Sequence, residues 1–384
     1  MDSRSEDEVR DVGRGSKLGD VIGKGVEEGV FPGAVALVAR EGEIIFLEAY
    51  GSRAILPEPL PMTKKTIFDL ASLTKPLATA LVVMQLVDKG KIGLDRKISG
   101  FLPHASLGDK GDLTPRLLLS HSAGLADWKP FYEKLCDHPM RDRKRMLRQW
   151  IVEEPFAYEP GRGSLYSDLG FMLLEWIIEE RAGENLADIV REHFYQPLGT
   201  RRTLFIPSEG SRLRSPVGKG GEEEFAATED CPWRGRVLQG EVHDDNAWAL
   251  GGYSGLAGLF STCEEVFTIV NMLREHYRGT RADFFKPETV REFWRRQDLV
   301  PGSDWALGWD TRALKGSSAG KYFSRDSVGH TGYTGTSIWM DLEKDVLVIF
   351  LSNRVHPTRN NEKIKLFRPV LHDAVMVALG LTSA

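Results

Sequence analysis

The most constraining feature of the chain is a serine and a lysine three residues apart, Ser72 and Lys75, at the start of a long apolar run. Residues three apart share one face of a helix, so the Lys75 amine can reach the Ser72 hydroxyl. A serine hydroxyl becomes a good nucleophile only when an adjacent base takes its proton. The run over 76–87 predicts a buried helix, with Pro76 in its first turn, where a missing N–H costs little. The pair therefore predicts a nucleophile near a helix N-terminus, whose dipole favours developing negative charge.

Two later segments extend this pair into an ordered set of three motifs. The second motif, Tyr166-Ser167-Asp168, opens an apolar stretch over 169–174 that predicts a helix. The third motif, His330-Thr331-Gly332, begins a segment that predicts a strand. In this order the motifs resemble those of serine β-lactamases and penicillin-binding proteins. The tyrosine of the second motif is similar to that of class C β-lactamases, DD-peptidases and β-lactamase-like esterases.

Three further segments spread the resemblance over roughly residues 18 to 380, nearly the whole chain. They lie at 117–125, 256–261 and 307–309. The resemblance implies an α+β fold of the β-lactamase/transpeptidase type. In that fold an antiparallel sheet is flanked by N- and C-terminal helices, a mainly helical domain is inserted, and the active site lies between the two.

The patterns at the two ends of the chain agree with this architecture. Both ends carry a pair of strand-like segments and one helix with an apolar stripe. If the two hairpins join in one antiparallel sheet, helices from both termini pack against it. Strands are predicted over 34–39, 43–50, 336–341 and 346–351, and helices over 16–28 and about 361–379.

We expect the chain to divide into two domains. Residues 16–70 and 300–384 form the predicted sheet domain, and 71–299 form the mainly helical domain. The polar residues 1–15 predict a disordered tail. Residues at about 207–240 are rich in Gly, Ser, Glu and Arg, which predicts a long loop.

Composition excludes several classes of function. A net charge of −5 over 384 residues gives no reason to expect nucleic acid as a partner. No apolar stretch approaches the roughly 20 residues that span a membrane, so no membrane association is predicted. The first residues lack the apolar core of a signal peptide, which favours a cytoplasmic protein, or a periplasmic one if a leader has been removed. Three cysteines without short spacing indicate neither a disulfide framework nor a metal site, and no cofactor is predicted. The oligomeric state stays open.

Three residues are predicted to carry the catalysis. Ser72 would attack an acyl carbon and form an acyl-enzyme, although serine is also a common helix N-cap. Lys75 would need a lowered pKa, or a hydrogen bond, to accept the Ser72 proton. Tyr166 would relay protons, its alternative role being an ordinary core aromatic. Which of the two is the stronger base stays open, so they are treated as one coupled unit.

The second and third motifs depart from the usual pattern of the family at two positions. Asp168 stands where an asparagine is usual, and an ionised aspartate only accepts hydrogen bonds. Its charge would stabilise a protonated Lys75 and disfavour an anionic substrate. His330 replaces the usual lysine and is mostly neutral at pH 7, so carboxylate-bearing substrates are expected to improve only below about pH 6.5. By resemblance, the backbone N–H groups of Ser72 and Tyr333 would form the oxyanion hole.

Other candidate positions have weaker assignments. Gly332 is expected to let the backbone approach the substrate closely. Arg354, just after the last strand, would supply the positive charge that His330 lacks, or would be an ordinary arginine at a strand end. The segment 242–246 contains His243 and two aspartates, and we interpret it as a loop held by its own hydrogen bonds. His121 is interpreted as structural and distant from the reacting atoms.

These assignments predict a serine hydrolase that acts on a small-molecule ester or amide. The first choice is a carboxylesterase for short-chain esters, because His330 and Asp168 both argue against a carboxylate-bearing substrate. The alternative is a DD-carboxypeptidase or weak β-lactamase acting on peptidoglycan-like substrates. A non-catalytic binding protein on the same fold is a more remote alternative, since a fold does not determine a function.

Overall fold

The computed structural model describes residues 17–208, 211 and 224–382. The predicted tail over 1–15 lies outside these ranges, as does much of the predicted loop over 207–240. The main element is a seven-stranded sheet in the order β3-β2-β1-β12-β11-β10-β9, and every pair in it is antiparallel. Its strands are β1 Gly33–Arg40, β2 Glu43–Ala54, β3 Leu60–Pro61, β9 Asp310–Thr311, β10 Val328–Thr331, β11 Ser337–Asp341 and β12 Val346–Ser352.

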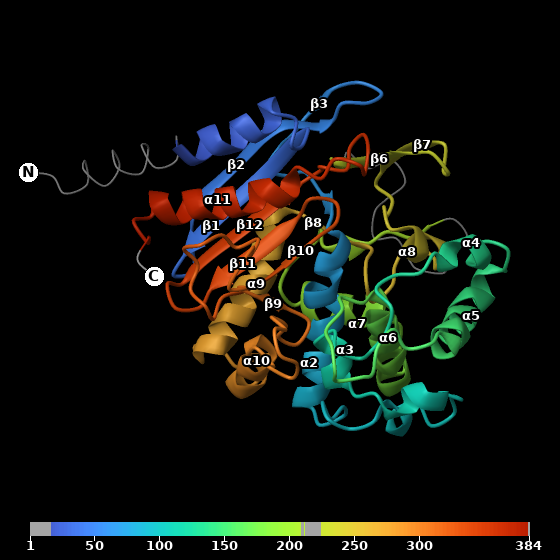
Figure 1. Cartoon of the computed structure of the whole chain (residues 1–384). Coiled ribbons are helices and arrows are strands. Elements are labelled where there is room, and N and C mark those ends of the chain that lie inside the picture. The colour runs from blue at the N-terminus through green and yellow to red at the C-terminus, as the bar shows by residue number, and fades with distance from the viewer. Residues whose placement is uncertain (1–16, 209–210, 212–223, 383–384) are drawn as a thin grey trace, which may run out of the picture.

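The two ends of the chain meet in the centre of this sheet, which confirms the predicted α+β architecture. β1 pairs with β12 along its length, with Val35 opposite Leu351 and Val38 opposite Val348. Because side chains alternate across a strand, successive residues of β1 enter two different cores. One core lies under the helix of residues 17–27 and α11 (Ile364–Ala378), and the other lies under α9 (Cys263–Arg278). Figure 1 shows the helix of residues 17–27 and α11 on one face of the sheet and α9 on the other.

Most of the remaining described elements are helices, which pack beside the sheet (Figure 1). They include two long helices, α5 and α6, and several short ones. None of the helices in the described ranges is both long and apolar enough to cross a membrane. The remaining α-helices are α2 Ala80–Asp88, α3 Pro115–Leu119, α4 Phe131–Leu135, α5 Met140–Glu153, α6 Asp168–Ala182, α7 Leu186–Val190, α8 Asp245–Ala249 and α10 Pro287–Trp294.

Three details differ from the sequence-based expectations. The helix after Ser72 is not a uniform α-helix: a 3₁₀ turn at Ala71–Leu73 and a π-helix at Lys75–Thr79 precede α2. The predicted loop at 207–240 contains a described hairpin, β6 Ala227–Cys231 and β7 Arg236–Gln239. His330 lies near the end of β10 rather than at the start of a strand, because Gly332 and its neighbours turn the chain into β11.

A small three-stranded sheet supports the segment that carries Ser72. Its strands are β4 Phe68–Asp69, β8 Leu259–Ser261 and β5 Leu204–Phe205, in the order β4-β8-β5. β4 ends at Asp69, three residues before Ser72, so the pairing of β4 with β8 anchors the approach to the predicted nucleophile. This position places the turn that contains Ser72 beside β10 of the large sheet and the start of the helical region.

Candidate active site

Ser72 lies in a tight turn that is held by a buried carboxylate. The Ala71 N–H donates to Asp69 Oδ1 at 2.8 Å, and the His243 N–H donates to Asp69 Oδ2 at 2.7 Å. Ala71 has a φ of +48°, a left-handed conformation that is unfavourable for a residue with a side chain. The hydrogen bonds of Asp69 therefore hold a strained turn and join it to the segment that contains His243.

Lys75 is completely buried and reaches three groups with its amine. Its Nζ lies 3.2 Å from Ser72 Oγ, 3.1 Å from the Leu256 carbonyl oxygen and 2.7 Å from Asp168 Oδ1. Burial by itself lowers the pKa of Lys75, but the Asp168 carboxylate and the Tyr166 phenol outweigh burial and raise it above its ordinary value. Of the two alternatives expected for Lys75, a lowered pKa and a hydrogen bond, the structure shows the hydrogen bond, because the nearest charge is the Asp168 anion, which stabilises the protonated amine as expected.

Tyr166 completes the group around the Ser72 hydroxyl. The Lys75 Nζ lies 5.0 Å from the Tyr166 ring centroid, and the side chains of Lys75 and Ser72 both act to lower the pKa of the phenol. Burial raises the pKa of Tyr166, the Lys75 cation opposes this rise, and the Asp168 carboxylate adds to it. The structure thus brings Ser72, Lys75 and Tyr166 together as the motifs predict.

The backbone around Tyr166 is fixed by the start of α6 and by His121. Ser167 caps α6: its hydroxyl accepts from the Gly170 N–H at 3.3 Å and donates to the Ala126 carbonyl at 2.6 Å. The Ser167 N–H donates to His121 Nδ1 at 3.0 Å, and the His121 ring lies 4.5 Å from the Tyr166 ring. His121 is structural, as expected, but it is not distant from the reacting groups. It is in direct contact with Tyr166.

His330 presents no positive charge to the site. Its side chain is buried, and its Nδ1 lies 3.0 Å from the Thr331 carbonyl, which can only accept, so Nδ1 carries the proton. Burial, and after it the Lys75 cation, lower the pKa of His330 to about 3. Its Nε2 is therefore a bare acceptor, and it has no hydrogen-bond partner in the described part of the chain. The expected gain for carboxylate substrates below about pH 6.5 is wrong, because the ring stays neutral far below that pH.

Hydrogen bonds connect the turn after His330 to the segment before Ser72. A side chain at Gly332 would meet Thr336 and would lie 2.6 Å from the Leu70 carbonyl oxygen. The Thr336 hydroxyl donates to that carbonyl at 3.0 Å, and the Thr334 hydroxyl donates to the Asp69 carbonyl at 2.7 Å. Gly332 thus permits close approach to the protein's own backbone, not to a substrate as expected. These contacts set the position of the Tyr333 N–H relative to Ser72.

Arg354 supports this turn from behind. It is buried, its Nε donates to the Tyr333 carbonyl at 2.8 Å, and its guanidinium lies 4.4 Å from the Tyr333 ring centroid. A second nitrogen donates to the carbonyls of Arg359 and Asn361 at 2.9 and 2.7 Å. With its donors on three backbone carbonyls, Arg354 does not line the cavity beside Ser72 and is not placed to bind a substrate carboxylate.

A cavity of about 410 Å³ opens at Ser72, and predicted site residues form part of its wall. Its aromatic lining includes a half-exposed Tyr333 ring and an exposed Trp128. Several lining residues were not predicted as site residues from the sequence, above all those of an acidic segment interpreted as a loop held by its own hydrogen bonds. The lining residues are Ala71, Ser72, Asp127, Trp128, Tyr166, Asp168, His243, Asp244, Asp245, Ala257, Tyr333 and Arg359.

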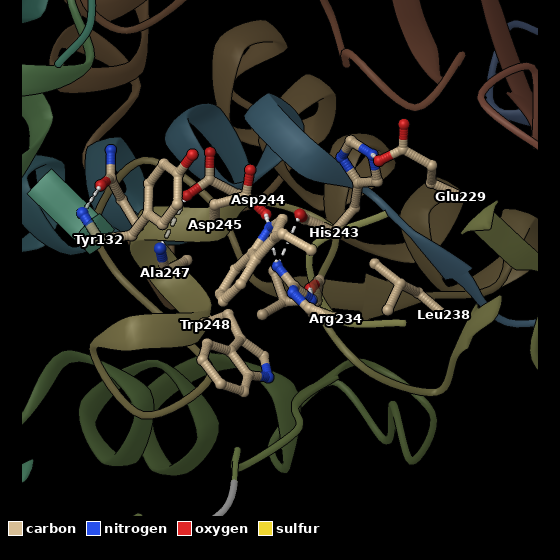
Figure 2. Close-up of polar contacts among 12 residues, drawn as sticks. Tyr132, Glu229, Arg234, Leu238, His243, Asp244, Asp245, Ala247 and Trp248 are labelled. Atoms are coloured by element: carbon tan, nitrogen blue, oxygen red, sulfur yellow. Dashed lines mark hydrogen bonds and ion pairs between the residues drawn. The ribbon is translucent and has the colours of Figure 1, made fainter. Parts of the chain in front are cut away.

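The acidic segment 243–245 is held by a network that Figure 2 shows. Arg234 is buried and donates to the His243 carbonyl at 3.0 Å and to Asp245 Oδ1 at 2.8 Å. Asp244 caps α8 by accepting from the Ala247 N–H at 2.7 Å. His243 Nε2 lies 3.3 Å from Glu229 Oε2. The visible signal in the sequence was the run of two aspartates, but only the folded chain places them on the wall of the Ser72 cavity.

Comparisons with known proteins agree with this geometry. The family described as Beta-lactamase matches residues 18–368. The N-acetylmuramyl-L-alanine amidase of Bacillus subtilis (strain 168) is 31% identical over 369 residues, which cover 88% of this chain and 81% of that protein. A putative D-alanyl-D-alanine carboxypeptidase of Escherichia coli O157:H7 is 30% identical over 354 residues, or 85% of this chain and 79% of that protein.

Solved structures show the same fold at lower sequence identity. EstCE1, a hydrolase with promiscuous acyltransferase activity, superposes with a TM-score of 0.73 at 22% identity, covering 96% of this chain and 99% of its own. The octameric penicillin-binding protein homologue from Pyrococcus abyssi has a TM-score of 0.70 at 22% identity, covering 95% and 77%.

Proposed function

The chain belongs to the beta-lactamase family, a family of serine hydrolases, and from this premise we propose that it cleaves carboxylic esters through an acyl-enzyme on Ser72. One observation carries the proposal. Ser72 and Tyr166 line one cavity, and the Ser72 hydroxyl lies 3.2 Å from the buried Lys75 amine, which in turn lies 5.0 Å from the Tyr166 ring centroid. Acyl transfer requires a nucleophile that lies beside proton-carrying side chains and opens into a cavity, and Ser72 has this arrangement with Lys75 and Tyr166.

In the acylation step, Ser72 Oγ bonds to the ester carbon and its proton passes to the Lys75–Tyr166 unit. The N–H groups of Ser72 and Tyr333 would bind the oxygen that becomes negative, an effect of about 3–4 kcal/mol per donor. Within the described chain the Tyr333 N–H donates to no other group, so it is free for this role. The C–O bond then breaks, and the alcohol leaves with the proton. A water attacks the acyl-enzyme by the same route and releases the acid.

The resting charge state makes this mechanism dependent on pH. Asp168 raises the pKa of both Lys75 and Tyr166, so the form that can accept the Ser72 proton is a minority at neutral pH. That minority grows as the pH rises. We therefore expect kcat/KM for a neutral ester to increase with pH through the apparent pKa of the coupled pair.

The charges around Ser72 support esters over β-lactams. A β-lactam carries a carboxylate, and the neutral His330 and the inward-facing Arg354 supply no cation for it. The alternative is a DD-carboxypeptidase or weak β-lactamase, and one observation favours it: relatives at about 30% identity are named putative D-alanyl-D-alanine carboxypeptidases. A peptidase would need another positive group for the terminal carboxylate, and Arg359 is the cavity's one described guanidinium.

Mass spectrometry of the intact protein tests the proposal. The protein is incubated separately with a p-nitrophenyl ester, a fluorescent penicillin and a D-Ala-D-Ala peptide, and Ser72→Ala is the matched control. Acylation and turnover with the ester, absent in Ser72→Ala, support an esterase. Stable labelling by penicillin together with cleavage of the peptide favours the carboxypeptidase. If no substrate labels Ser72 and none turns over, the enzymatic proposal is wrong and a binding role takes its place.

A further inference from the structure

The cavity beside Ser72 is strongly acidic. Four carboxylates line it, and one guanidinium, that of Arg359, is the only described cation among its lining residues. The carboxylates come from Asp127, Asp168, Asp244 and Asp245. Ser72 lies in the same wall, so any substrate that acylates it enters this field of negative charge.

Two of the four carboxylates are already neutralised. Asp168 pairs with Lys75 at 2.7 Å. Asp245 is paired with Arg234 at 2.8 Å and with Arg359 at 3.3 Å. Arg359 is itself shared with Glu229 and is therefore not a free cation for a substrate. The ion pairs inside the wall thus leave no positive charge in surplus.

The other two carboxylates have no ion-pair partner in the described part of the chain. The Asp127 side chain is exposed, and within the described chain its carboxylate accepts only from the Trp128 N–H, at 2.8 Å. The Asp244 carboxylate accepts there only from the Ala247 N–H, at 2.7 Å. A carboxylate has about four acceptor sites, so one hydrogen bond leaves most of each group unused.

A second, independent feature of the site is also an unused acceptor. The Nε2 of His330 is buried, unprotonated and without a hydrogen-bond partner among the described residues, and the His330 ring lies 6.1 Å from that of Tyr166, which lines the cavity. The family pattern would place a lysine ammonium at this position. Here the protein offers an acceptor where a cation is usual, while Asp127 and Asp244 line the same cavity as Tyr166.

We propose that Asp244, assisted by Asp127, makes the Ser72 cavity select substrates that carry a protonated or quaternary amine and reject those that carry a carboxylate. This inference rests on the proposed function, since it names the class of ester that the site accepts. An ammonium group donates up to three hydrogen bonds and would satisfy acceptors that the protein leaves empty. A carboxylate in the same place would meet like charges.

The electrostatics of Asp244 agree with this assignment. Burial, and after it the Asp168 carboxylate, raise the pKa of Asp244 to about 7. The surroundings therefore destabilise the ionised form of Asp244, and a nearby ammonium group would stabilise it. The rival explanation is that Asp244 serves only as the N-cap of α8, a role that asparagine fills equally well. Asp244→Asn therefore removes the charge and keeps the cap.

Two matched series of esters test the proposal at pH 8, where Asp244 is mostly ionised. In the first, phenyl esters of glycine, β-alanine and γ-aminobutyrate are compared with their neutral isosteres, the propanoate, butanoate and pentanoate, and with the monophenyl succinate. In the second, butyrylcholine is compared with dimethylbutyl butanoate, so that the cation lies in the leaving group. The quantity measured is the ratio of kcat/KM for the charged ester to that for its neutral isostere.

The native enzyme is expected to favour the cationic ester by about tenfold or more in at least one series, the size of one hydrogen bond between charged groups. That ratio should fall toward one in Asp244→Asn and should fall less in Asp127→Asn. It should stay unchanged in the control variant Asp20→Asn, which removes an exposed carboxylate from the N-terminal helix. The succinate ester should be the poorest substrate of native enzyme and should gain in Asp244→Asn. A ratio near one in both series, or a preference that survives Asp244→Asn, overturns the inference.

The outcome is separable from that of the proposed function. Hydrolysis of the neutral esters without a preference for amines leaves the esterase intact and removes only the role of Asp244. If no ester acylates Ser72, calorimetric titration of the Ser72→Ala protein with butylammonium decides the matter. Binding that weakens about tenfold in the Ser72→Ala, Asp244→Asn double variant supports the amine site, and equal binding or none refutes it.

Discussion

The buried amine of Lys75 lies 2.7 Å from Asp168 Oδ1 and 3.2 Å from Ser72 Oγ, so the cation of the first motif is shared between an anion and the nucleophile. An asparagine at position 168 would leave Lys75 without a charge partner. The aspartate instead stabilises the protonated amine. This pair thereby determines how much of the enzyme is ready to accept the Ser72 proton at a given pH.

Replacing Asp168→Asn is expected to move the rise of kcat/KM with pH to lower pH. Asp168 raises the pKa of Lys75 and Tyr166, so its neutral replacement lowers both, and more of the enzyme is in the proton-accepting form at neutral pH. The measurement is the pH profile of kcat/KM for a neutral p-nitrophenyl ester. A midpoint that stays in place, or moves upward, contradicts the assignment of these groups.

The same substitution is expected to lower the stability of the fold. Removing one partner of a buried ion pair costs up to about 3–5 kcal/mol, because the remaining charge is left unpaired in a poorly solvated site. Thermal unfolding of Asp168→Asn should therefore show a lower Tm than the native protein at pH 6. The difference should shrink at high pH, where Lys75 of the variant loses its proton. An equal loss of Tm at both pH values would show that shape, not charge, determines the effect.

Lys75→Ala and Tyr166→Phe should each lower kcat by about 10²–10⁴-fold, the range for a lost proton-transfer group. Lys75 contacts the Ser72 hydroxyl and lies 5.0 Å from the Tyr166 ring centroid, and because the two side chains act as one unit the double variant should lose much less than the product of the two single losses. The measurement is steady-state hydrolysis of a neutral ester. Near-normal kcat in both single variants would remove the proton-carrier assignment. A double variant with fully multiplicative losses would show that the two residues act independently.

His330→Lys should raise kcat/KM for a penicillin relative to a neutral ester of similar size, by about tenfold for an interaction of 1.4 kcal/mol. In Asp244→Asn, which lacks the carboxylate whose pKa lies at about 7, the same ratio should stay flat between pH 8 and pH 5, because the pKa of His330 is about 3 and the ring remains neutral throughout. His330→Gln, which adds no charge, serves as the control. If the ratio in Asp244→Asn climbs as the pH falls toward 5, the ring is charging in that range and its neutral assignment is wrong.

Arg354→Ala should lower kcat/KM for all substrates together. The guanidinium holds three backbone carbonyls around Tyr333, and each carbonyl left unsatisfied costs about 1–3 kcal/mol. We expect a lower Tm and poorer catalysis with an unchanged ratio between penicillin and neutral ester. Arg325→Ala, at an exposed arginine, is the comparison. A selective loss for penicillin would instead place Arg354 in contact with the substrate carboxylate.

Much of this protein was predictable from local sequence patterns. The spacing of Ser72 and Lys75 puts two side chains on one turn of a helix, and their contact needs no long-range information. Continuous apolar runs at 34–39 and 346–351 predicted strands, and in the structure both strands are central and buried on both faces. The start of α6 at Asp168 follows from Ser167, whose hydroxyl caps the helix.

The roles of single residues at the site were less predictable. Arg354 and Gly332 sit where the family pattern suggests substrate contacts, yet both contact the protein's own backbone. Arg354 contacts the carbonyl of Tyr333, and Gly332 lies beside the carbonyl of Leu70. In both cases the two residues are distant in sequence and close in space. Asp244 shows the opposite case, since the hydrogen bonds expected of its loop are present, but its place on the cavity wall is not visible in the sequence.

The sequence by itself thus determined which groups could perform the chemistry, because nucleophile, proton carriers and capping residues are recognised by their type and by short spacings. Only the tertiary structure decided their charge states. The pKa of Lys75 rises because Asp168, 93 positions away in the printed sequence, is packed against a completely buried amine. That of His330 falls because the fold removes the ring from water. Burial and the distance between charges determine a pKa, and both depend on how remote segments pack together.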